Sequence, residues 1–425
     1  MQFPSIRNNI QKQHLSQLSN IPWEQNAHQY DKQISFITDP HWHGGAYYVQ
    51  ESSSMFLGYM INQVLDRGLL KQTGCKILDL CAAPGGKTTH VLDLFSEENL
   101  LVANEIVPKR NSTLRENLTR WGNTNYIVTQ NYPEDFCALE QYFDLLIIDA
   151  PCSGEGLFRK SPEAKNEWSE ENVEMCAVRQ SNILQNSISL LKDNGILIYS
   201  TCTFQERENE AQISWLLENG FELIPFDISL FTEITEGKLQ NTFRFTLEKV
   251  MGSGLFIACL CKINNINHPI KSKTNTIRKT HFPEKFEFQD AFKWSKKASE
   301  FNFYIIKNKL YAFFKHFDTD LNLLFNSGLN ITSFGTEIGE MKKELFIPSH
   351  ALALSAIVRD DLPSIELDKD SALQYLRKNE MNIDASDFQL GWALVQYEGI
   401  NLGWVKVLQS RINNYLPKSF RILHY

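Results

Sequence analysis

The sequence predicts a doubly wound α/β domain in the middle of the chain, and two observations support this. First, short and nearly continuous apolar runs alternate with longer amphipathic runs from Lys76 to about Lys262. Apolar character on both faces is typical of parallel strands covered by helices on both sides. Second, the longer runs have the length and spacing of helices that connect one parallel strand to the next.

Five apolar runs are expected to form the parallel strands. They are KILDL (76–80), LLVANE (100–105), NYIVT (125–129), FDLLIIDA (143–150) and GILIYS (195–200). Further along, FRFTLEKVMGSGLFIACLCK (243–262) is expected to form two strands joined by a turn at Gly252–Gly254, antiparallel at the edge of the sheet. Together these runs are long enough to build one sheet.

Four amphipathic runs are expected to form helices between these strands. They are KTTHVLDLF (87–95), PKRNSTLRENLTRW (108–121), EENVEMCAVRQSNILQNSISLL (170–191) and RENEAQISWLLENG (207–220). Pro108 suits the first turn of its helix because that turn needs no amide donor from it. Gly195 is expected to stop the third helix before the next strand.

The length of 425 residues predicts more than one domain. Four regions are expected: a mostly helical N-terminal region at 1–70, the doubly wound domain at 71–262, a polar and basic linker at 263–284, and a second region of short strands and helices at 285–425. The last region is rich in Phe, Tyr and Trp.

The bulk composition is that of a globular protein, with 43% hydrophobic and 22% charged residues. The first residues are polar and no apolar run is long enough for a membrane span, so a cytoplasmic protein without membrane contact is expected. The eight cysteines form no CxxC pair and no histidine cluster has zinc-ligand spacing, so no metal is expected. Most of these thiols are expected to be packing residues.

Charge is distributed unevenly along the chain. Residues 1–262 carry 21 Lys and Arg against 32 Asp and Glu, whereas residues 263–425 carry 21 against 18. The overall net charge of −8 argues weakly against a nucleic-acid partner. An enzyme can nevertheless keep an acidic catalytic body and place its affinity for RNA in a basic region elsewhere.

A glycine-containing loop follows the first strand, in the segment DLCAAPGGKT (79–88). Gly85 and Gly86 allow the backbone to approach a ligand at the start of the following helix. A phosphate-binding P-loop would need glycine five residues before Gly86, where the chain has Cys81. Glu105 ends the second strand and is placed to accept hydrogen bonds from both ribose hydroxyls of an adenosine. The alternative for Glu105 is an exposed residue at the start of a helix.

Two cysteines follow two consecutive strands. Cys152 lies in DAPCSG (149–154) and Cys202 lies in STCT (200–203). Consecutive strands of such a sheet are usually neighbours, and ligands bind at their carboxyl ends. We therefore expect both thiols to face one pocket beside the glycine loop, although core packing is the usual role of a single cysteine.

Paired thiols suit one particular reaction. Carbon 5 of cytosine is too weakly nucleophilic to attack a methyl sulfonium, but a thiolate that adds to carbon 6 makes carbon 5 reactive. A second group must then help to remove the proton from carbon 5 and to expel the thiol. A methylase of exocyclic amines would instead carry an Asn/Asp-Pro-Pro-aromatic turn, which DAPC is not.

LDLCAAPGGKT, DAPCSGEG and YSTCT together resemble the Nol/Nop/Sun family of RNA 5-methylcytosine methyltransferases. YYVQESSSM (47–55) resembles the segment that precedes the family's catalytic domain, and FRKSPEAKNEW (158–168) and GSGLFIA are similar to its bacterial RsmF-like branch. Residues 391–422 resemble that branch's C-terminal PUA-like RNA-binding domain. The resemblance implies a Rossmann-like S-adenosylmethionine-dependent enzyme that acts on RNA, with ribosomal RNA favoured over transfer RNA. We expect a monomer.

The resemblance also implies roles for individual residues. Cys202 would be the nucleophile, Cys152 would assist release, and Lys87 and Asp149 would lie near the flipped cytosine. The cofactor would be held by Cys81, Ala82, Ala83, Pro84, Gly85, Gly86, Lys87, Glu105, Arg110 and Asp149. The family usually has an acidic residue after the third strand, where this chain has TQNYPE (129–134); Asn131 is expected to contact the adenine instead.

Alternatives from other classes are a catalytically inactive RNA-binding protein and a small-molecule methyltransferase. The first is disfavoured because both cysteines, Lys87, Asp149 and Glu105 are present. The second needs neither a second cysteine nor a basic, aromatic C-terminal region. In that region Lys406, Arg411, Lys418 and Arg421 are expected to bind RNA. The nearby rings of Trp392, Tyr397, Trp404 and Tyr415 are expected mainly in the domain core.

Overall fold

The computed structural model describes residues 4–423 apart from 13–18, 31–34, 159–164, 166–167, 251, 264–281, 344 and 382. Most of the linker expected at 263–284 and most of the segment FRKSPEAKNEW (158–168) lie outside the described residues. No helix among the residues described has the length and apolar character needed to cross a bilayer.

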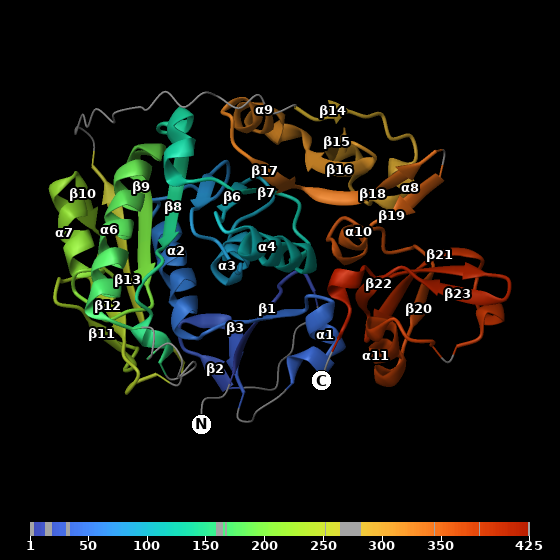
Figure 1. The fold of residues 1–425 in the computed structure, drawn as a ribbon, viewed down its shortest axis with the longest axis horizontal. Helices are drawn as coiled ribbons and strands as arrows, with labels where there is room; N and C mark the ends of the chain where they lie inside the picture. The colour runs from blue at the N-terminus through green and yellow to red at the C-terminus, as the bar shows by residue number, and fades with distance from the viewer. Residues whose placement is uncertain are drawn as a thin grey trace.

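A mixed sheet forms the centre of the molecule, and its central strands are parallel (Figure 1). The strand order is β11-β12-β13-β9-β8-β5-β6-β7-β17, and β10 pairs with β13. The parallel strands are β5 (Lys76–Asp79), β6 (Leu100–Asn104), β7 (Tyr126–Thr129), β8 (Phe143–Asp149) and β9 (Leu191–Thr201). The predicted strands and the doubly wound arrangement are confirmed.

Antiparallel strands complete the sheet beyond β9. They are β10 (Phe221–Leu223), β11 (Ile234–Glu236), β12 (Thr242–Phe245) and β13 (Leu255–Lys262). β12 and β13 form the predicted antiparallel pair. The expectation that this pair lies at the sheet edge is wrong, because β13 is hydrogen-bonded to β9 and β12, and β12 is hydrogen-bonded to β13 and β11.

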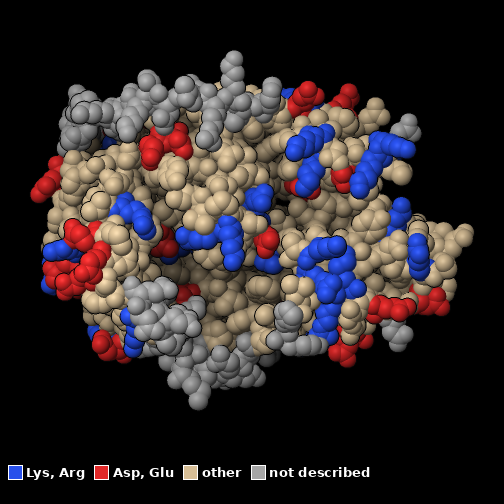
Figure 2. All heavy atoms as spheres, in the orientation of Figure 1, with Lys and Arg blue, Asp and Glu red and all other residues tan. Residues whose placement is uncertain are grey.

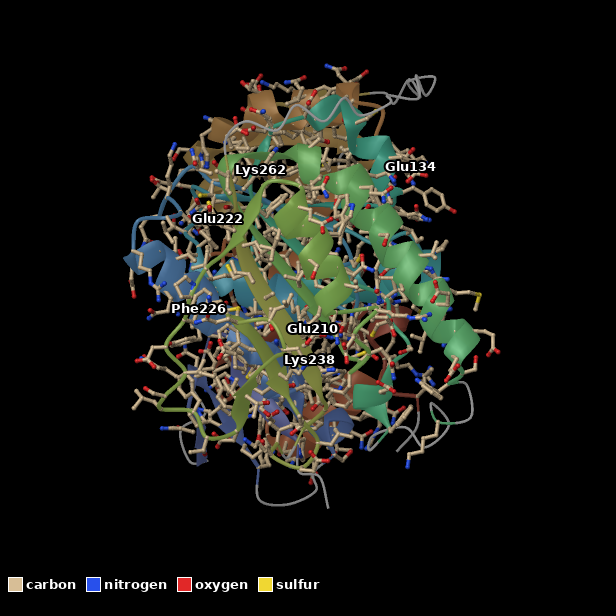
Figure 3. The ribbon with its side chains drawn as sticks, turned by 90° about the vertical axis from the view of Figure 1, so that its left-hand side faces the viewer. Glu134, Glu210, Glu222, Phe226, Lys238 and Lys262 are labelled. Atoms are coloured by element: carbon tan, nitrogen blue, oxygen red, sulfur yellow. The ribbon has the colours of Figure 1, made fainter. Side chains whose placement is uncertain are left out.

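Helices cover both faces of the sheet. One face is covered by α2 (Phe56–Asp66), α3 (Gly86–Leu94) and α4 (Pro108–Trp121), and the other by α6 (Glu170–Ser187) and α7 (Glu210–Glu218). Successive strand residues therefore enter different cores: Ile147 packs with the first set and Ile148 with the second. Figure 3 shows Glu210, at the start of α7, close to Lys238, whose amide donates to Glu210 Oε1 at 3.4 Å.

The third helix ends earlier than predicted. α6 stops at Ser187, and a 3-10 turn leads directly into β9. The residue that takes the left-handed conformation before the buried part of β9 is Asn194 (φ 61°), not Gly195. Asparagine tolerates this conformation better than most residues, so it serves the turn that the sequence assigned to glycine.

The expectation of a mostly helical N-terminal region is wrong. Strands β1 (Ser5–Asn8), β2 (Ser19–Ile21), β3 (Glu24–Gln29) and β4 (Tyr47–Val49) form a sheet of order β2-β3-β1-β4, and the α-helices among the described residues of this region are α1 (Pro40–His43) and α2. These strands bury polar side chains. Arg7 on β1 pairs with Asp93 of α3 and donates to Thr89 Oγ1 at 2.7 Å. Burial of hydrogen-bonded polar groups hides the apolar alternation by which strands are recognised.

Residues 285–425 do not form one region apart from the catalytic domain, so that expectation is also wrong. β17 (Ile331–Phe334) pairs with β7 and covers what would otherwise be a free edge of the central sheet. The elements around it are β14 (Glu284–Lys285), α8 (Ala291–Trp294), β15 (Phe301–Ile306), β16 (Lys309–Phe314), α9 (Asp318–Asn326), β18 (Thr336–Lys342), β19 (Leu345–Pro348) and α10 (His350–Leu354).

The remaining residues form a small C-terminal domain. It consists of β20 (Ser364–Glu366), α11 (Lys369–Arg377), β21 (Gly391–Tyr397), β22 (Ile400–Leu408) and β23 (Arg411–Asn414), in the order β20-β21-β22-β23. Trp404 on β22 is buried and donates from Nε1 to the carbonyl of Ser349 at 2.7 Å. This confirms the core role expected for that ring and ties the domain to the preceding unit.

His350 sits at this junction without a hydrogen-bond partner among the described residues. Both of its ring nitrogens are buried, and its ring packs edge-on against Phe420 at a centroid distance of 4.3 Å. Burial lowers the pKa of His350 to about 3, and the nearby cations Arg120 and Lys12 lower it further. The folded protein therefore holds this imidazole neutral, whereas the unfolded chain protonates it below its ordinary pKa.

Stability should consequently fall as the pH drops below about 6.5, because the unfolded state binds a proton that the folded state excludes. For His350 the loss between pH 6.5 and 5 is about 2 kcal/mol. Urea unfolding at several pH values measures it. His350→Phe, which keeps a ring and removes the titrating group, should flatten this part of the profile. An unchanged slope in His350→Phe would show that the imidazole is protonated in the folded state.

Candidate active site

The candidate site lies where the order of the strands reverses. β5 pairs with β6 on one side and with β8 on the other, so the chain first builds outward to β7 and then returns to add β8 and β9. Loops that leave β5 and β8 therefore run in opposite directions and leave a crevice at the carboxyl ends of the strands. The glycine loop follows β5, the Cys152 loop follows β8 and the Cys202 loop follows β9.

The glycine loop has the backbone needed to approach a ligand. Gly85 has φ 113°, a conformation that side chains disfavour, and Gly86 begins α3. A Cβ atom on Gly86 would lie 3.3 Å from the ring of Tyr48, so the loop is also tightly packed from behind. Ala82 N–H donates to the carbonyl of Asn104 at 2.8 Å, which anchors the loop to the end of β6.

Asp79 is a functional candidate to which sequence reasoning gave no role. Its Oδ2 accepts from Thr88 Oγ1 at 2.7 Å, but its buried Oδ1 has no partner among the described residues. Burial raises the pKa of Asp79 to about 7. An unpartnered buried carboxylate oxygen next to the glycine loop fits a ligand that brings a cationic donor, such as the amino group of a bound S-adenosylmethionine.

Glu105 is buried at the end of β6, so the alternative of an exposed residue at a helix start is wrong. Its Oε1 accepts from the amide of Val107 at 2.9 Å, and its Oε2 lies 3.3 Å from Arg110 Nη1. Arg110 also donates from Nη2 to the carbonyl of Ala83 at 2.8 Å. Both predicted cofactor residues thus meet at the glycine loop, where a carboxylate can accept from ribose hydroxyls.

The structure does not favour Asn131 as an adenine contact through its side-chain oxygen. That oxygen already accepts from the amide of Asn330 at 3.0 Å, which belongs to the unit that carries β17. An acidic residue nevertheless follows β7. Asp135 folds back over the turn, and its Oδ2 accepts from the amide of Tyr132 at 2.9 Å and from Asn131 Nδ2 at 3.4 Å. The sequence signal that could have indicated Asp135 is Pro133, which lies in the turn between Asn131 and Asp135.

Lys87 and Asp149 form the charged pair of the site. Lys87 Nζ lies 2.8 Å from Asp149 Oδ2, and Ser200 Oγ donates to Asp149 Oδ1 at 2.7 Å. Lys87 comes from α3, Asp149 from the end of β8 and Ser200 from β9. Three segments that are far apart in the sequence therefore meet through one partly exposed carboxylate.

The two cysteines face each other, as predicted. Cys152 Sγ and Cys202 Sγ are 3.1 Å apart, both thiols are free, and both are partly exposed. The hydrogen bond with Cys202, together with burial, raises the pKa of Cys152 well above its ordinary value. Burial and neighbouring carboxylates also raise the pKa of Cys81, so that thiol stays protonated.

Two carboxylates interlock the cysteine loops, and sequence reasoning missed both. Glu208, which follows the Cys202 loop, accepts from the amide of Ser153 at 3.0 Å and from the side chain of Gln180 at 2.8 Å. Glu155, which follows Cys152, accepts in return from the amide of Phe204 at 3.0 Å. Glu208 is fully buried. Each loop therefore carries the carboxylate that fixes the other.

The β12–β13 turn and the N-terminal region close the same site. Gly156 N–H donates to the carbonyl of Cys202 at 2.7 Å, and Gly254 N–H donates to the carbonyl of Gly156 at 3.1 Å. The amide of Ser253 donates to Glu51 Oε2 at 2.9 Å. The segment ESSS thus meets the glycine turn at the Cys202 loop, a contact that no local pattern in the sequence indicates.

The C-terminal cations predicted to bind RNA fall into two groups. Lys406 lies with its Nζ 5.5 Å above the ring of Trp392, and Arg411 is exposed at the start of β23. Lys418 and Arg421 are exposed elsewhere, at the 3-10 turn η9 (Lys418–Phe420), and lower the pKa of Lys378, which burial already depresses. Figure 2 shows basic side chains gathered over this end of the C-terminal domain.

The described residues contain no group of three or more His, Cys, Asp and Glu side chains arranged to hold a metal ion. The polar groups at the strand ends are instead carboxylates, one ammonium and two thiols. This set suits an organic cofactor with a cationic and a sugar portion, together with covalent chemistry on the second substrate.

Comparison with known proteins agrees with this geometry. Residues 68–261 match the family described as 16S rRNA methyltransferase RsmB/F, and residues 362–422 match the RsmF PUA domain. A ribosomal RNA small subunit methyltransferase F of Shewanella loihica is 30% identical over 382 residues, covering 88% of this chain and 77% of that protein. One of Vibrio vulnificus is 29% identical over 396 residues, covering 88% and 79%.

A solved structure supports the fold. The methyltransferase homologue of Pyrococcus horikoshii superposes with a TM-score of 0.51 at 26% identity, covering 62% of this chain and 87% of the other. The family resemblance seen in the motifs LDLCAAPGGKT, DAPCSGEG and YSTCT is confirmed. The chain belongs to the RsmB/F family of 16S rRNA methyltransferases.

Proposed function

We propose that this chain methylates carbon 5 of a cytosine in ribosomal RNA, with S-adenosylmethionine as the methyl donor. The observation that carries the proposal is the pair of free thiols, 3.1 Å apart, at the ends of neighbouring strands beside the glycine loop. The names of the relatives support ribosomal RNA over transfer RNA. An inactive RNA-binding protein would have no need of both thiols.

The residues at the strand ends fit the cofactor. Asp79 would hold its amino group, the loop from Cys81 to Gly86 would pack along it, and Glu105, steadied by Arg110, would accept from its ribose. When bound, S-adenosylmethionine supplies an electrophilic methyl group. Asp135 replaces Asn131 as the residue we propose beside the adenine.

The thiols would carry the covalent steps on the RNA. The Cys202 thiol gives up its proton to a base in the site as Sγ bonds to carbon 6 of the flipped cytosine, and the electron pair of the 5,6 double bond shifts toward carbon 5, which becomes nucleophilic. Lys87 and Asp149 lie beside the thiols and would orient the ring and exchange protons with it. After methylation, loss of the carbon 5 proton restores the double bond and expels Cys202, with Cys152 assisting this release.

The contact between the thiols suits this division of roles. A thiol with a raised pKa remains protonated, and a protonated thiol is a poor nucleophile but a usable proton donor. The choice of Cys202 as the nucleophile rests on the resemblance of STCT to the family motif, because both thiols share one contact.

Cys202→Ala should abolish methylation and form no covalent adduct with RNA, because the attacking sulfur is gone. Cys152→Ala should instead accumulate a protein–RNA adduct that survives a denaturing gel. Cys75→Ala, which removes a buried thiol just before β5, at the end of the strand opposite the site, is the matched control and should remain active. An adduct in Cys202→Ala but not in Cys152→Ala would reverse the assignment.

Glu105→Ala should weaken S-adenosylmethionine binding by about 1.5–3 kcal/mol, because the substitution removes a buried charge-assisted hydrogen bond to the ribose. Glu105→Gln should lose less, since an amide oxygen still accepts. Calorimetric titration measures both. Glu105 also accepts a hydrogen bond from the amide of Val107, just before α4. Circular dichroism therefore checks that the helix content of both variants equals that of the parent. Cofactor affinity equal to that of the parent would show that the carboxylate serves α4 alone.

We further propose that the C-terminal domain holds the RNA while the strand ends perform the chemistry, in a cytoplasmic monomer. Extruding a cytosine from a helix costs a few kcal/mol, and contacts remote from the base have to offset it. Lys418 and Arg421 are exposed cations close enough to Lys378 to influence its pKa, which is the kind of charge density that phosphates neutralise.

Lys418→Gln combined with Arg421→Gln should therefore weaken RNA binding and reduce its dependence on salt concentration. The slope of log affinity against log salt should fall by about one unit for each phosphate that the variant no longer neutralises. Lys71→Gln with Lys238→Gln, which removes two exposed cations distant from this domain, should leave the slope unchanged. Equal salt-dependence slopes for both double variants would show that η9 does not contact the RNA.

A further inference from the structure

A cavity of about 300 Å³ lies between the N-terminal region and α4. Aromatic rings form most of its wall: Phe36, Trp42, Tyr47, Tyr48 and Trp121. Arg120 and Asn117, both on α4, supply the polar groups. Cavities of this size are at the small end of ligand sites, so the volume suits one flat ring system rather than a long ligand.

Arg120 is the charged group of this pocket. Its guanidinium carbon lies 4.7 Å from the ring centre of Trp42 and 5.1 Å from that of Phe420. Nη1 donates to Asn117 Oδ1 at 2.8 Å, but the buried Nε has no hydrogen-bond partner among the described residues. No described carboxylate lies within ion-pair distance of it. A cation flanked by rings, with an unused donor, favours an aromatic ligand that brings acceptors and negative charge.

The pocket connects the two parts of the site already described. Asn117 Nδ2 donates to the carbonyl of Pro84 at 2.8 Å, and Tyr48 packs behind Gly86, so one wall is shared with the glycine loop. On the other side, Phe420 belongs to the turn that carries Lys418. An RNA strand held by Lys418 and Arg421 on its way to the cysteines would pass this opening.

The cofactor itself is a poor occupant. Glu105, its proposed ribose contact, precedes the first turn of α4, whereas the pocket is lined by Asn117, Arg120 and Trp121 at the other end of that helix. At 1.5 Å per residue these positions are about 15 Å apart along the helix axis. The pocket is therefore a separate site, on the side of the glycine loop that Tyr48 covers.

We propose that this pocket binds one unpaired base of the RNA substrate, stacked on the aromatic wall and hydrogen-bonded to Arg120. The proposal rests on the proposed function, since it takes RNA as the substrate. Lys418 and Arg421 would contact only phosphates. A second extruded base, bound in the pocket, would therefore fix the position of the RNA relative to the cysteines. The pocket would thereby contribute to the choice of the target cytosine.

The test uses the full chain and a fluorescent single-stranded RNA of mixed sequence, about 12 nucleotides long. Trp42→Leu should weaken binding about 5- to 100-fold, the range for removing one base–aromatic stack. Arg120→Gln should also weaken it. Ile37→Glu, a surface change at the rim, where Ile37 is 46% exposed, should weaken binding without any risk to the core. S-Adenosylhomocysteine affinity should stay at the parental value in all three.

Phe292→Leu is the matched control, because it removes an exposed ring that does not line the pocket. It should bind RNA as the parent does.

RNA carrying 4-thiouridine should crosslink to residues 36–49 in the parent and lose that crosslink in Ile37→Glu. Parental RNA affinity in Ile37→Glu and Trp42→Leu would overturn the proposal. Equal losses of RNA and S-adenosylhomocysteine affinity would also overturn it and assign the pocket to the cofactor. Failure of the proposed function is a separate outcome, because it shows as a Cys152→Ala variant that accumulates no covalent adduct with RNA.

Discussion

The reciprocal fixation of the two cysteine loops is the constraint on which the candidate site depends. Glu208 binds the amide of Ser153, and Glu155 binds the amide of Phe204, so each loop is held by a carboxylate from the other. Loops that follow parallel strands have no ladder to fix them beyond the strand ends. The buried carboxylate of Glu208 and the partly exposed one of Glu155 accept amide hydrogen bonds and supply this rigidity, because leaving a buried partner unpaired would be costly. The 3.1 Å separation of the thiols follows from this arrangement.

The N-terminal sheet has a comparable role for the glycine loop. Arg7 reaches from β1 into α3, pairs with Asp93 and stacks on Trp121 of α4 at 4.6 Å. Buried ion pairs of this kind contribute little net stability, but removing one partner is strongly destabilising. The orientation of α3 is thereby coupled to that of α4 and to the N-terminal region. Lys87, which projects from α3 to Asp149, depends on that orientation.

Charge and aromatic surface are divided along the path proposed for the RNA. In this proposal the acidic body would carry the chemistry, the basic turn at η9 would contact phosphates, and the aromatic pocket around Trp42 and Arg120 would lie between them. Such a division separates affinity from selectivity, since phosphate contacts carry no sequence information and base contacts do. It also places the contacts that offset base extrusion outside the reacting centre.

Local patterns in the sequence were enough to predict the parallel strands, most of the helices and the motif residues. Those features are local: continuous apolar runs mark the buried strands, and Cys152, Cys202 and Lys87 lie in short segments that follow them. The neighbouring positions of both thiols followed from the rule that consecutive parallel strands are adjacent. The sequence could not reveal the N-terminal sheet, because its strands bury polar residues such as Arg7, whose partners lie on α3. It took the tertiary structure to show that β17 joins β7 and that Glu155 and Glu208 cross between loops. These contacts join residues from separate segments, and no local periodicity encodes such a pairing.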